Sequence, residues 1–218
     1  MHPEITLDQQ YALKTAATRL ERDFAGTFSV ETIERFLSSS YDQFAGRAKI
    51  TTFLPLLAER FARQRLNALA RVEGKHLGGK PTVLFLCVHN AGRSQMALGF
   101  FEHYAGDDAV AWSGGSEPGD RVNGEAIAVM TERGIDISNE YPKPWTDEIV
   151  RAADVVITMG CGDACPIFPG KRYEEWVLDD PAGLAATDIR PIRDEIERRV
   201  LALLAELSVA PRFDRARP

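Results

Sequence analysis

The spacing of hydrophobic residues divides the chain into two parts with different periodicities. Up to about residue 73, hydrophobic positions recur every three to four residues, which is the period of amphipathic helices. From Thr82 onward, short aliphatic and β-branched runs alternate with helical patterns. The sequence therefore predicts an N-terminal helical domain (1–73), a glycine-containing linker (74–81) and an α/β domain (82–210).

The first part predicts three amphipathic helices that form a small bundle. The first covers residues 7–24, and Ser29 is a suitable N-cap for the second, which continues to about residue 44. The third covers 52–71, where Pro55 is compatible with a helix only in the first turn. The expected hydrophobic faces consist of Leu13, Ala16, Ala17, Leu20 and Phe24; Ile33, Phe36 and Leu37; and Phe53, Leu56, Leu57, Phe61, Leu66 and Leu69.

The second part predicts alternating strands and helices. This alternation is typical of a parallel sheet covered by helices, in which ligands bind at the carboxyl ends of the strands. Strands are expected at 82–87, 109–113, 153–158 and near Trp176, and helices at 93–105, 122–134, 146–152 and 188–207.

Composition limits the possible partners and the cellular compartment. The formal net charge of −6 argues against nucleic acid or an anionic membrane as the main partner, so a small anion has to be held by local geometry. No leader is evident, and no hydrophobic run approaches the ~20 residues that a membrane span requires. We therefore expect a cytoplasmic protein. Its three cysteines suit catalysis or redox chemistry better than a disulfide framework.

The clearest indication of chemistry is the loop between the first predicted strand and the helix that follows it. The five residues between Cys87 and Arg93 can wrap their backbone N–H groups around a tetrahedral oxyanion at a helix N-terminus. Arg93 adds a planar pair of donors, and Ser94 lies within hydrogen-bond reach of Cys87. The same groups stabilise a thiolate that can attack the anion. The expected substrate-binding residues are Val88, His89, Asn90, Ala91, Gly92, Arg93 and Ser94.

Two residues of this loop are suited to unusual backbone conformations. Gly92 can adopt backbone angles closed to other residues, and Asn90 tolerates the left-handed region. The alternative interpretation of the whole segment is a buried structural cysteine with Arg93 on a solvated helix face.

Cys161 and Cys165 follow another predicted strand, at 153–158. Parallel strands end at one edge of a sheet, so all three cysteines can gather around one site. A dithiol that exchanges with Cys87 is the sharper interpretation, and a metal site is the alternative. No nearby pair of Cys or His completes four ligands, so we expect neither a metal nor another cofactor.

A pair of carboxylates precedes Pro181. A carboxylic acid opposite the nucleophile can protonate the oxygen that leaves an oxyanion adduct. Of Asp179 and Asp180, the second is the better candidate, because Pro181 restricts its backbone to an extended form. An ordinary Asp-Pro turn is the alternative.

Together these segments resemble the thioredoxin-coupled arsenate reductases of the low-molecular-weight tyrosine phosphatase superfamily. The resemblance covers about 82–207 and implies a four-stranded parallel sheet flanked by helices, here preceded by the extra helical bundle. It depends on the motifs Val83–Ala97, Ser113–Gly115, Gly134–Ser138, Thr158–Pro166, Asp179–Gly183 and Arg190–Ile196.

The resemblance also implies a mechanism. Cys87 attacks arsenate, Asp180 protonates the leaving oxygen, and Arg93 holds the resulting thiol–arsenate adduct. Cys161 then attacks the Cys87 sulfur, which releases arsenite and forms a disulfide. Cys165 attacks Cys161 and moves the disulfide outward, where thioredoxin reduces it.

Other functions remain open at this point. A tyrosine phosphatase would use the same loop and acid, although phosphatases usually follow Asp-Pro with tyrosines, and Pro181 is followed by Ala182. A reductase recycled by mycothiol typically lacks the extra cysteines. The N-terminal helices could make the chain a regulatory protein, but Cys87, Arg93 and Asp180 are intact. We also expect those helices to form a homodimer through their hydrophobic surface.

Overall fold

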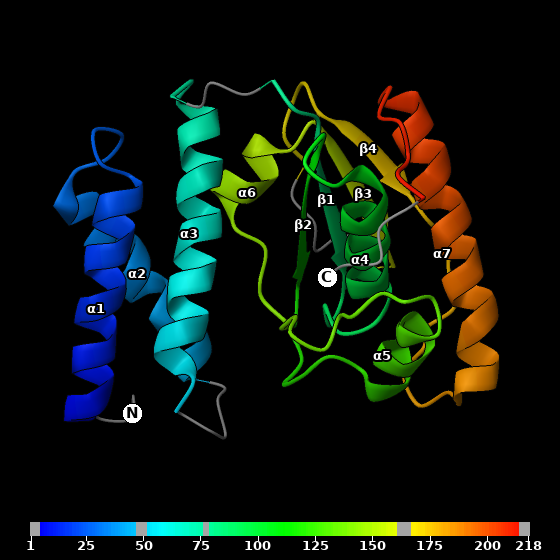
Figure 1. Ribbon diagram of the computed structural model, residues 1–218, viewed down its shortest axis with the longest axis horizontal. Coiled ribbons are helices and arrows are strands. Elements are labelled where there is room, and N and C mark those ends of the chain that lie inside the picture. The colour runs from blue at the N-terminus through cyan, green and yellow to red at the C-terminus, as the bar shows by residue number, and fades with distance from the viewer. Residues whose placement is uncertain (1–4, 47–51, 76–78, 161–166, 214–218) are drawn as a thin grey trace. The chain divides into compact units, whose positions relative to one another are not determined.

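The computed structural model describes residues 5–46, 52–75, 79–160 and 167–213. The chain divides into two compact units, residues 1–77 and 78–218. The first contains helices α1 to α3, and the second contains the sheet and helices α4 to α7 (Figure 1). In the described part of the chain, no helix is both long and hydrophobic enough to cross a membrane.

The N-terminal unit consists of α1 (Leu7–Asp23), α2 (Val30–Ala45) and α3 (Leu54–Val72), as the periodicity predicts. Each helix packs against the other two. Ser29 caps α2 by accepting a hydrogen bond from the Thr32 N–H (3.2 Å). Pro55 lies in the first turn of α3, where its missing N–H costs no helical hydrogen bond.

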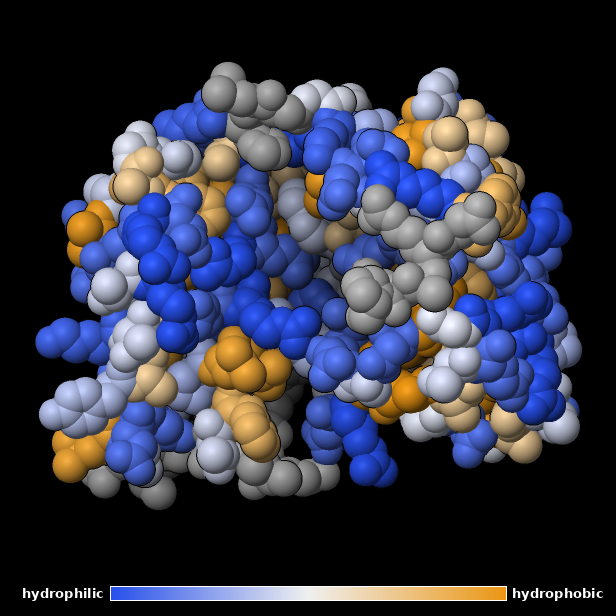
Figure 2. Space-filling view, in the orientation of Figure 1, coloured by the Kyte–Doolittle hydropathy of each residue, from blue (hydrophilic) through white to orange (hydrophobic). Residues whose placement is uncertain are grey.

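The predicted hydrophobic face of α3 is wrong at its N-terminal end. Phe53 and Leu56 are 62% and 53% exposed, and hydrophobic side chains are visible on the surface of this unit in Figure 2. The buried face consists of Leu54, Ala58, Phe61, Ala62 and Leu66. Phe61 and Leu66 are therefore buried as predicted, whereas Leu54 is buried in place of Phe53 and Leu56.

The second unit is built on four parallel strands. They are β1 (Thr82–Cys87), β2 (Val110–Gly115), β3 (Val155–Met159) and β4 (Arg172–Glu175), in the spatial order β2-β1-β3-β4. The predicted four-stranded parallel sheet is confirmed. All six residues of β1 are buried, because this strand is central and covered on both faces.

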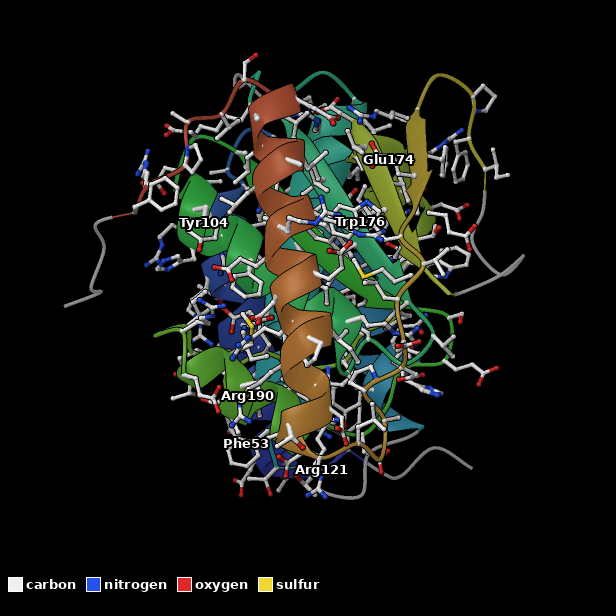
Figure 3. All side chains as sticks on the ribbon, turned by 90° about the vertical axis from the view of Figure 1, so that its right-hand side faces the viewer. Phe53, Tyr104, Arg121, Glu174, Trp176 and Arg190 are labelled. Carbon is white, nitrogen blue, oxygen red and sulfur yellow. The ribbon has the colours of Figure 1, made fainter. Side chains whose placement is uncertain are left out.

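Four helices connect and cover these strands: α4 (Arg93–Ala105), α5 (Gly124–Thr131), α6 (Asp147–Ala152) and α7 (Ala186–Glu206). Helix α7 packs against α4 and α5 on one side of the sheet, and α6 lies on the other (Figure 1). Trp176, which follows β4, is buried next to α7, and the Arg199 guanidinium lies 5.9 Å from the centre of its ring (Figure 3).

Strand β2 is longer at its carboxyl end than the predicted 109–113. The segment Ser113–Gly115 continues the parallel pairing with Phe85–Cys87. Glycines weaken a strand locally, so the pattern of residue types gave no sign of this extension. As a result, the chain after β2 leaves the sheet beside Cys87.

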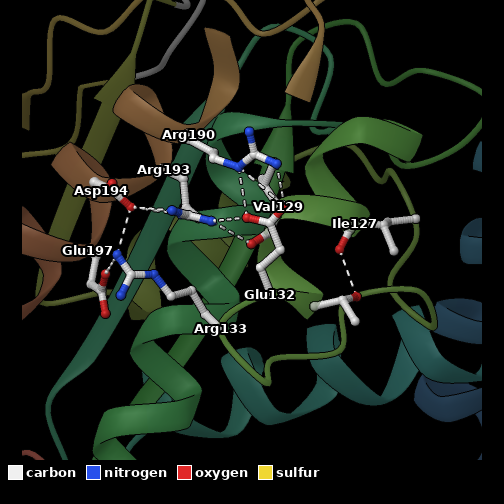
Figure 4. Close-up of polar contacts among 9 residues, drawn as sticks. Ile127, Val129, Glu132, Arg133, Arg190, Arg193, Asp194 and Glu197 are labelled. Carbon is white, nitrogen blue, oxygen red and sulfur yellow. Dashed lines mark hydrogen bonds and ion pairs between the residues drawn. The ribbon is translucent and has the colours of Figure 1, made fainter. Parts of the chain in front are cut away.

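An ion-pair cluster joins the end of α5 to α7 (Figure 4). The Arg193 guanidinium donates to Glu132 Oε2 (2.9 Å), Asp194 Oδ1 (2.8 Å) and the Val129 carbonyl (2.9 Å). Hydrogen bonds from Arg190 and then Arg193 lower the pKa of Glu132 to about 2. The cluster consists of Glu132, Arg133, Arg190, Arg193, Asp194 and Glu197.

Candidate active site

Cys87 is the last residue of the central strand and is 2% exposed. The parallel register places it between Gly115 of β2 and Met159 of β3. Three chain segments therefore leave the sheet around this thiol. This is the edge at which open α/β sheets bind ligands.

The anion loop, residues 88–92, uses its backbone groups asymmetrically. All five carbonyl oxygens accept hydrogen bonds, from Glu117 N, Gly119 N, the Gln95 side chain, Asn123 N, and the N–H groups of Gln95 and Met96. By contrast, no N–H group of the loop donates to an acceptor among the described residues. Because buried N–H groups need acceptors, this arrangement presents a row of donors to a ligand at the N-terminus of α4.

Asn90 fixes the shape of the loop from its centre. It is fully buried and has a φ of +46°, so the predicted left-handed conformation is confirmed. Its Oδ1 accepts from the Lys143 N–H (3.0 Å) and Gln95 Nε2 (3.2 Å), and its Nδ2 donates to Ser94 Oγ (2.9 Å). These bonds hold a residue in a conformation that is otherwise costly.

Ser94 connects this network to the thiol. Its Oγ lies 3.0 Å from Cys87 Sγ, which confirms the predicted contact. Because Asn90 Nδ2 already donates to the same oxygen, the Ser94 hydroxyl is free to direct its own proton to the sulfur.

Arg93 is the first residue of α4 and is 8% exposed. Its Nη2 donates to Asp180 Oδ2 (2.8 Å), and its Nη1 donates to the Leu178 carbonyl (3.3 Å). The Asp180 side chain is half exposed, and its Oδ1 accepts from the Ala182 N–H (3.1 Å). The structure thus brings Arg93 and Asp180 together, as the sequence predicts.

A small hollow of about 40 Å³ lies over the thiol. A water molecule needs roughly 10–15 Å³ by this measure, so the hollow has room for a few oxygen-sized groups. It is therefore suited to a small anion. Its walls are formed by Cys87, His89, Ala91, Gly92, Arg93, Asn123, Asp180, Pro181 and Ala182.

The structure adds a steric reason for glycine at position 92, which was not predicted. Gly92 has a φ of −127°, outside the left-handed region. Instead, a Cβ at this position would lie 2.6 Å from Pro181 Cγ, so a side chain has no space. Glycine is required here by the close approach of the segment that carries Asp180.

His89 is exposed at the rim of the hollow. Its Nδ1 lies 3.0 Å from the carbonyl oxygen of Glu117. Because a carbonyl oxygen can only accept, Nδ1 carries the proton in this hydrogen bond. The sequence placed His89 in the loop but did not predict this partner.

Cys161 and Cys165 lie outside the described residues. The last described residue before them is Gly160, which has a φ of +75°, and a Cβ there would lie 3.1 Å from Arg93 Nη1. The carboxyl end of β3 therefore lies close to the side chain of Arg93.

Sequence reasoning missed several residues that shape the site. Asn123 and Lys143 reach the anion loop from distant parts of the chain, and Lys143 is a buried lysine whose Nζ lies 3.4 Å from the Tyr141 carbonyl. Asn123 carried one usable signal, since asparagine before Gly-Glu-Ala is a typical N-cap. Among the described residues, no group of three His, Cys, Asp or Glu side chains is arranged to hold a metal ion.

The parallel sheet, the anion loop and the arginine at the start of α4 define a phosphatase-type anion site. The family model described as low molecular weight phosphotyrosine protein phosphatase matches residues 82–211, and the chain belongs to this family. A second model, the N-terminal domain of protein-tyrosine-phosphatase-like proteins, matches residues 13–70 and therefore covers most of the helical unit.

Within this family, the chain is similar to both arsenate reductases and tyrosine phosphatases. A thioredoxin-dependent arsenate reductase from Corynebacterium glutamicum is 44% identical, with 92% of this chain and 98% of that chain covered and a TM-score of 0.83. Arsenate reductase 2 from Staphylococcus epidermidis is 41% identical over 56% of this chain and 94% of the relative. A low-molecular-weight tyrosine phosphatase from T. tengcongensis is 25% identical over 58% of this chain and 99% of that chain, with a TM-score of 0.53.

Proposed function

We propose that the protein is an arsenate reductase recycled by thioredoxin. The observation that carries this proposal is the anion loop, which directs all its carbonyls into the protein and leaves its N–H groups without described acceptors above Cys87. Arsenate is a tetrahedral oxyanion of the size that such a loop accommodates. The similarity to the C. glutamicum and S. epidermidis reductases supports this substrate over a phosphotyrosyl group.

In the first step, the Cys87 thiolate attacks the arsenic atom and forms a sulfur–arsenic bond. One arsenate oxygen leaves, and Asp180 protonates it so that it departs as water. The loop N–H groups and the Arg93 guanidinium stabilise the charge on the remaining oxygens. The Ser94 hydroxyl contacts the attacking sulfur and can donate a hydrogen bond to it.

In the second step, the Cys161 thiolate attacks Cys87 Sγ. A Cys87–Cys161 disulfide forms as the sulfur–arsenic bond breaks, and its electron pair reduces As(V) to arsenite. Cys165 then attacks Cys161, forming a Cys161–Cys165 disulfide and freeing the Cys87 thiolate. The dithiol of thioredoxin reduces that disulfide and completes the cycle. Because the relay needs free thiols, we place the reaction in the reducing cytoplasm.

We also propose that residues 1–73 form a domain separate from the reductase domain, 82–210, with 74–81 as the linker. Leu7, Tyr11, Phe53 and Leu56 are more than half exposed in the helical unit. Burying such side chains against a second copy removes hydrophobic surface from water, which favours a homodimer.

The test is arsenite release from arsenate by the purified chain. It is measured with thioredoxin and its reductase, with mycothiol and its redoxin, and with no thiol partner, beside hydrolysis of an aryl phosphate. Turnover only with thioredoxin supports the proposal. Turnover only with mycothiol would show that mycothiol, and not thioredoxin, is the reductant. Hydrolysis of the aryl phosphate without arsenite release would show that the protein is a phosphatase.

Cys165→Ser tests the relay separately. This variant should release one arsenite per enzyme and then stall, because the Cys87–Cys161 disulfide forms but cannot be passed on. Mass spectrometry after arsenate treatment should find that disulfide. Sustained turnover with thioredoxin would show that Cys165 is dispensable and that another route regenerates the enzyme.

A further inference from the structure

Asn123, the residue before α5, forms hydrogen bonds in three directions. Its backbone N–H donates to the Ala91 carbonyl of the anion loop (2.8 Å). Its Oδ1 caps α5 by accepting from the N–H groups of Glu125 (2.9 Å) and Ala126 (3.1 Å). Its Nδ2 donates to the Pro181 carbonyl (3.4 Å). One residue therefore contacts the anion loop, a helix terminus and the segment that carries Asp180.

The orientation of the Asn123 amide is fixed by these partners. Backbone N–H groups can only donate, so the side-chain oxygen has to face α5. The NH₂ group then has to face Pro181, whose carbonyl can only accept. The hydrogen bonds from α5 to Asn123 Oδ1 therefore fix the amide in the orientation in which Nδ2 reaches the Asp180 segment.

The Asp180 segment, residues 178–182, also packs on Gly92 of the anion loop through Pro181. Among the described residues, its other hydrogen bonds to this part of the site come from Arg93, which donates to Asp180 and to the Leu178 carbonyl. A bound oxyanion competes for those same guanidinium donors. The hydrogen bonds from Arg93 to the Asp180 segment are therefore weakest when an anion is bound, which is when Asp180 has to donate its proton. The hydrogen bond from Asn123 does not use Arg93 and persists.

We propose that Asn123 is a positioning residue that holds Asp180 over the anion loop while the anion occupies Arg93. The inference rests on the proposed role of Asp180 as the general acid. The absence of a side chain at Gly92 completes the arrangement, because it lets Pro181 lie directly on the loop. Asn123 draws the segment in, and Gly92 leaves the space for it.

Asn123→Ser separates this contact from the others. Serine is as good an N-cap as asparagine, and the backbone N–H to Ala91 is retained, but the hydroxyl is too short to reach Pro181 as well. We expect the rate of the first chemical step in a single turnover to fall about tenfold, a part of what general acids contribute. Inorganic phosphate, used as a probe of the anion site, should bind within about twofold of its original affinity, because the loop donors are unchanged.

The decisive measurement is whether the effect of Asn123→Ser on the rate depends on the presence of Asp180. In an Asp180→Asn background, Asn123→Ser should cause no further loss, because no acid remains to be positioned. A merely structural role would slow both backgrounds equally, and this result would overturn the inference. Asn67→Ser, a matched change at an exposed position of α3, should leave the rate unchanged.

A second readout does not depend on arsenate chemistry. If the wild-type chain reduces no arsenate, the proposed function fails, and the inference is decided by alkylation of Cys87 with iodoacetamide, followed by mass spectrometry of its peptide. Release of the Asp180 segment should make Asn123→Ser react several-fold faster than wild type, by roughly the same factor as Gly92→Ala, which pushes Pro181 away. An unchanged alkylation rate in Asn123→Ser would then overturn the inference.

Discussion

Two buried arginines, Arg93 in the candidate active site and Arg193 in the ion-pair cluster, are 8% and 5% exposed, respectively. Arg193 donates to acceptors at the end of α5 and in α7 itself, namely Val129, Glu132 and Asp194. The described acceptors of Arg93 are the Leu178 carbonyl and the Asp180 carboxylate, which belong to one short segment.

The difference separates a structural arginine from one that is available to a ligand. A guanidinium has five N–H donors, and Arg193 uses them to hold two helices together. Arg93 faces a hollow that a tetrahedral anion can enter, and its carboxylate partner is half exposed and replaceable. Burial and charge are thus similar in the two regions, and the identity of the partners distinguishes them.

The largest expected effect comes from removing Cys87, the proposed nucleophile beside Arg93. Cys87→Ser should lower arsenate reduction by more than about a thousandfold, since a serine hydroxyl is a far weaker nucleophile than a thiolate. The fold should be unchanged, because the two side chains are similar in size and the Ser94 contact can be kept. Arsenite release and circular dichroism measure the two expectations. Substantial remaining activity would exclude Cys87 as the nucleophile.

The next prediction exchanges the two arginines for lysine in separate variants. Arg93→Lys should lower activity about a hundredfold, because lysine cannot contact two oxygens of the anion at once. Arg193→Lys should keep its activity and instead lose about 1–2 kcal/mol of unfolding free energy, because several hydrogen bonds between α5 and α7 are lost. Arsenite release and urea unfolding are measured for both. If the two variants lower activity equally, Arg93 and Arg193 do not differ as ligand-binding and structural arginines.

These two regions also differ in how far the sequence predicted them. The segments 82–87 and 93–105 have the predicted boundaries, because a hydrophobic strand, a loop and a helix are all local patterns. The contact between Cys87 and Ser94 could be predicted for the same reason. The ion-pair cluster was not predicted, because it joins side chains about 60 positions apart, as the bond from Arg193 to Glu132 shows.

Other parts of the site depend on tertiary contacts that residue types alone do not encode. The bonds from Lys143 to Asn90 and from Asn123 to Ala91 bring distant segments to the loop. Phe53 shows the opposite error, because hydrophobic character predicted burial where the start of α3 buries Leu54 and Ala58 instead. Thus local chemistry was predictable, whereas the residues that position it required the fold.

A smaller effect is expected from pH acting on the ion-pair cluster. The pKa of Glu132 is lowered from 4.5 to about 2, mainly by the hydrogen bond from Arg190. A lowered carboxyl pKa stabilises the fold above the unfolded pKa, and this contribution is lost as pH falls between 4.5 and about 2. Glu132→Gln should therefore lower the urea midpoint at neutral pH, and the difference from wild type should shrink over that range.

Activity is the control for Glu132→Gln. Because Glu132 contacts Arg190 and Arg193 and not the anion loop, kcat at neutral pH should stay the same. A difference in urea midpoint that is independent of pH would show that the carboxylate charge does not stabilise the junction of α5 and α7. A loss of kcat would show that the cluster and the site are coupled.

Only a small effect on activity is expected from removing residues 1–78. The anion loop, Asp180, both further cysteines and the ion-pair cluster all lie beyond this segment, and the second unit has its own core built on β1 and α4. Activity should stay within about twofold, because domains with their own cores commonly fold alone. An insoluble or inactive product would reject the proposed domain boundary.

Sedimentation of the full and shortened chains tests the proposed homodimer. We expect a dimer for the full chain and a monomer for the shortened one, because the exposed side chains of Leu7, Tyr11, Phe53 and Leu56 are removed. If both chains are monomers, dimerisation through the helical unit is rejected.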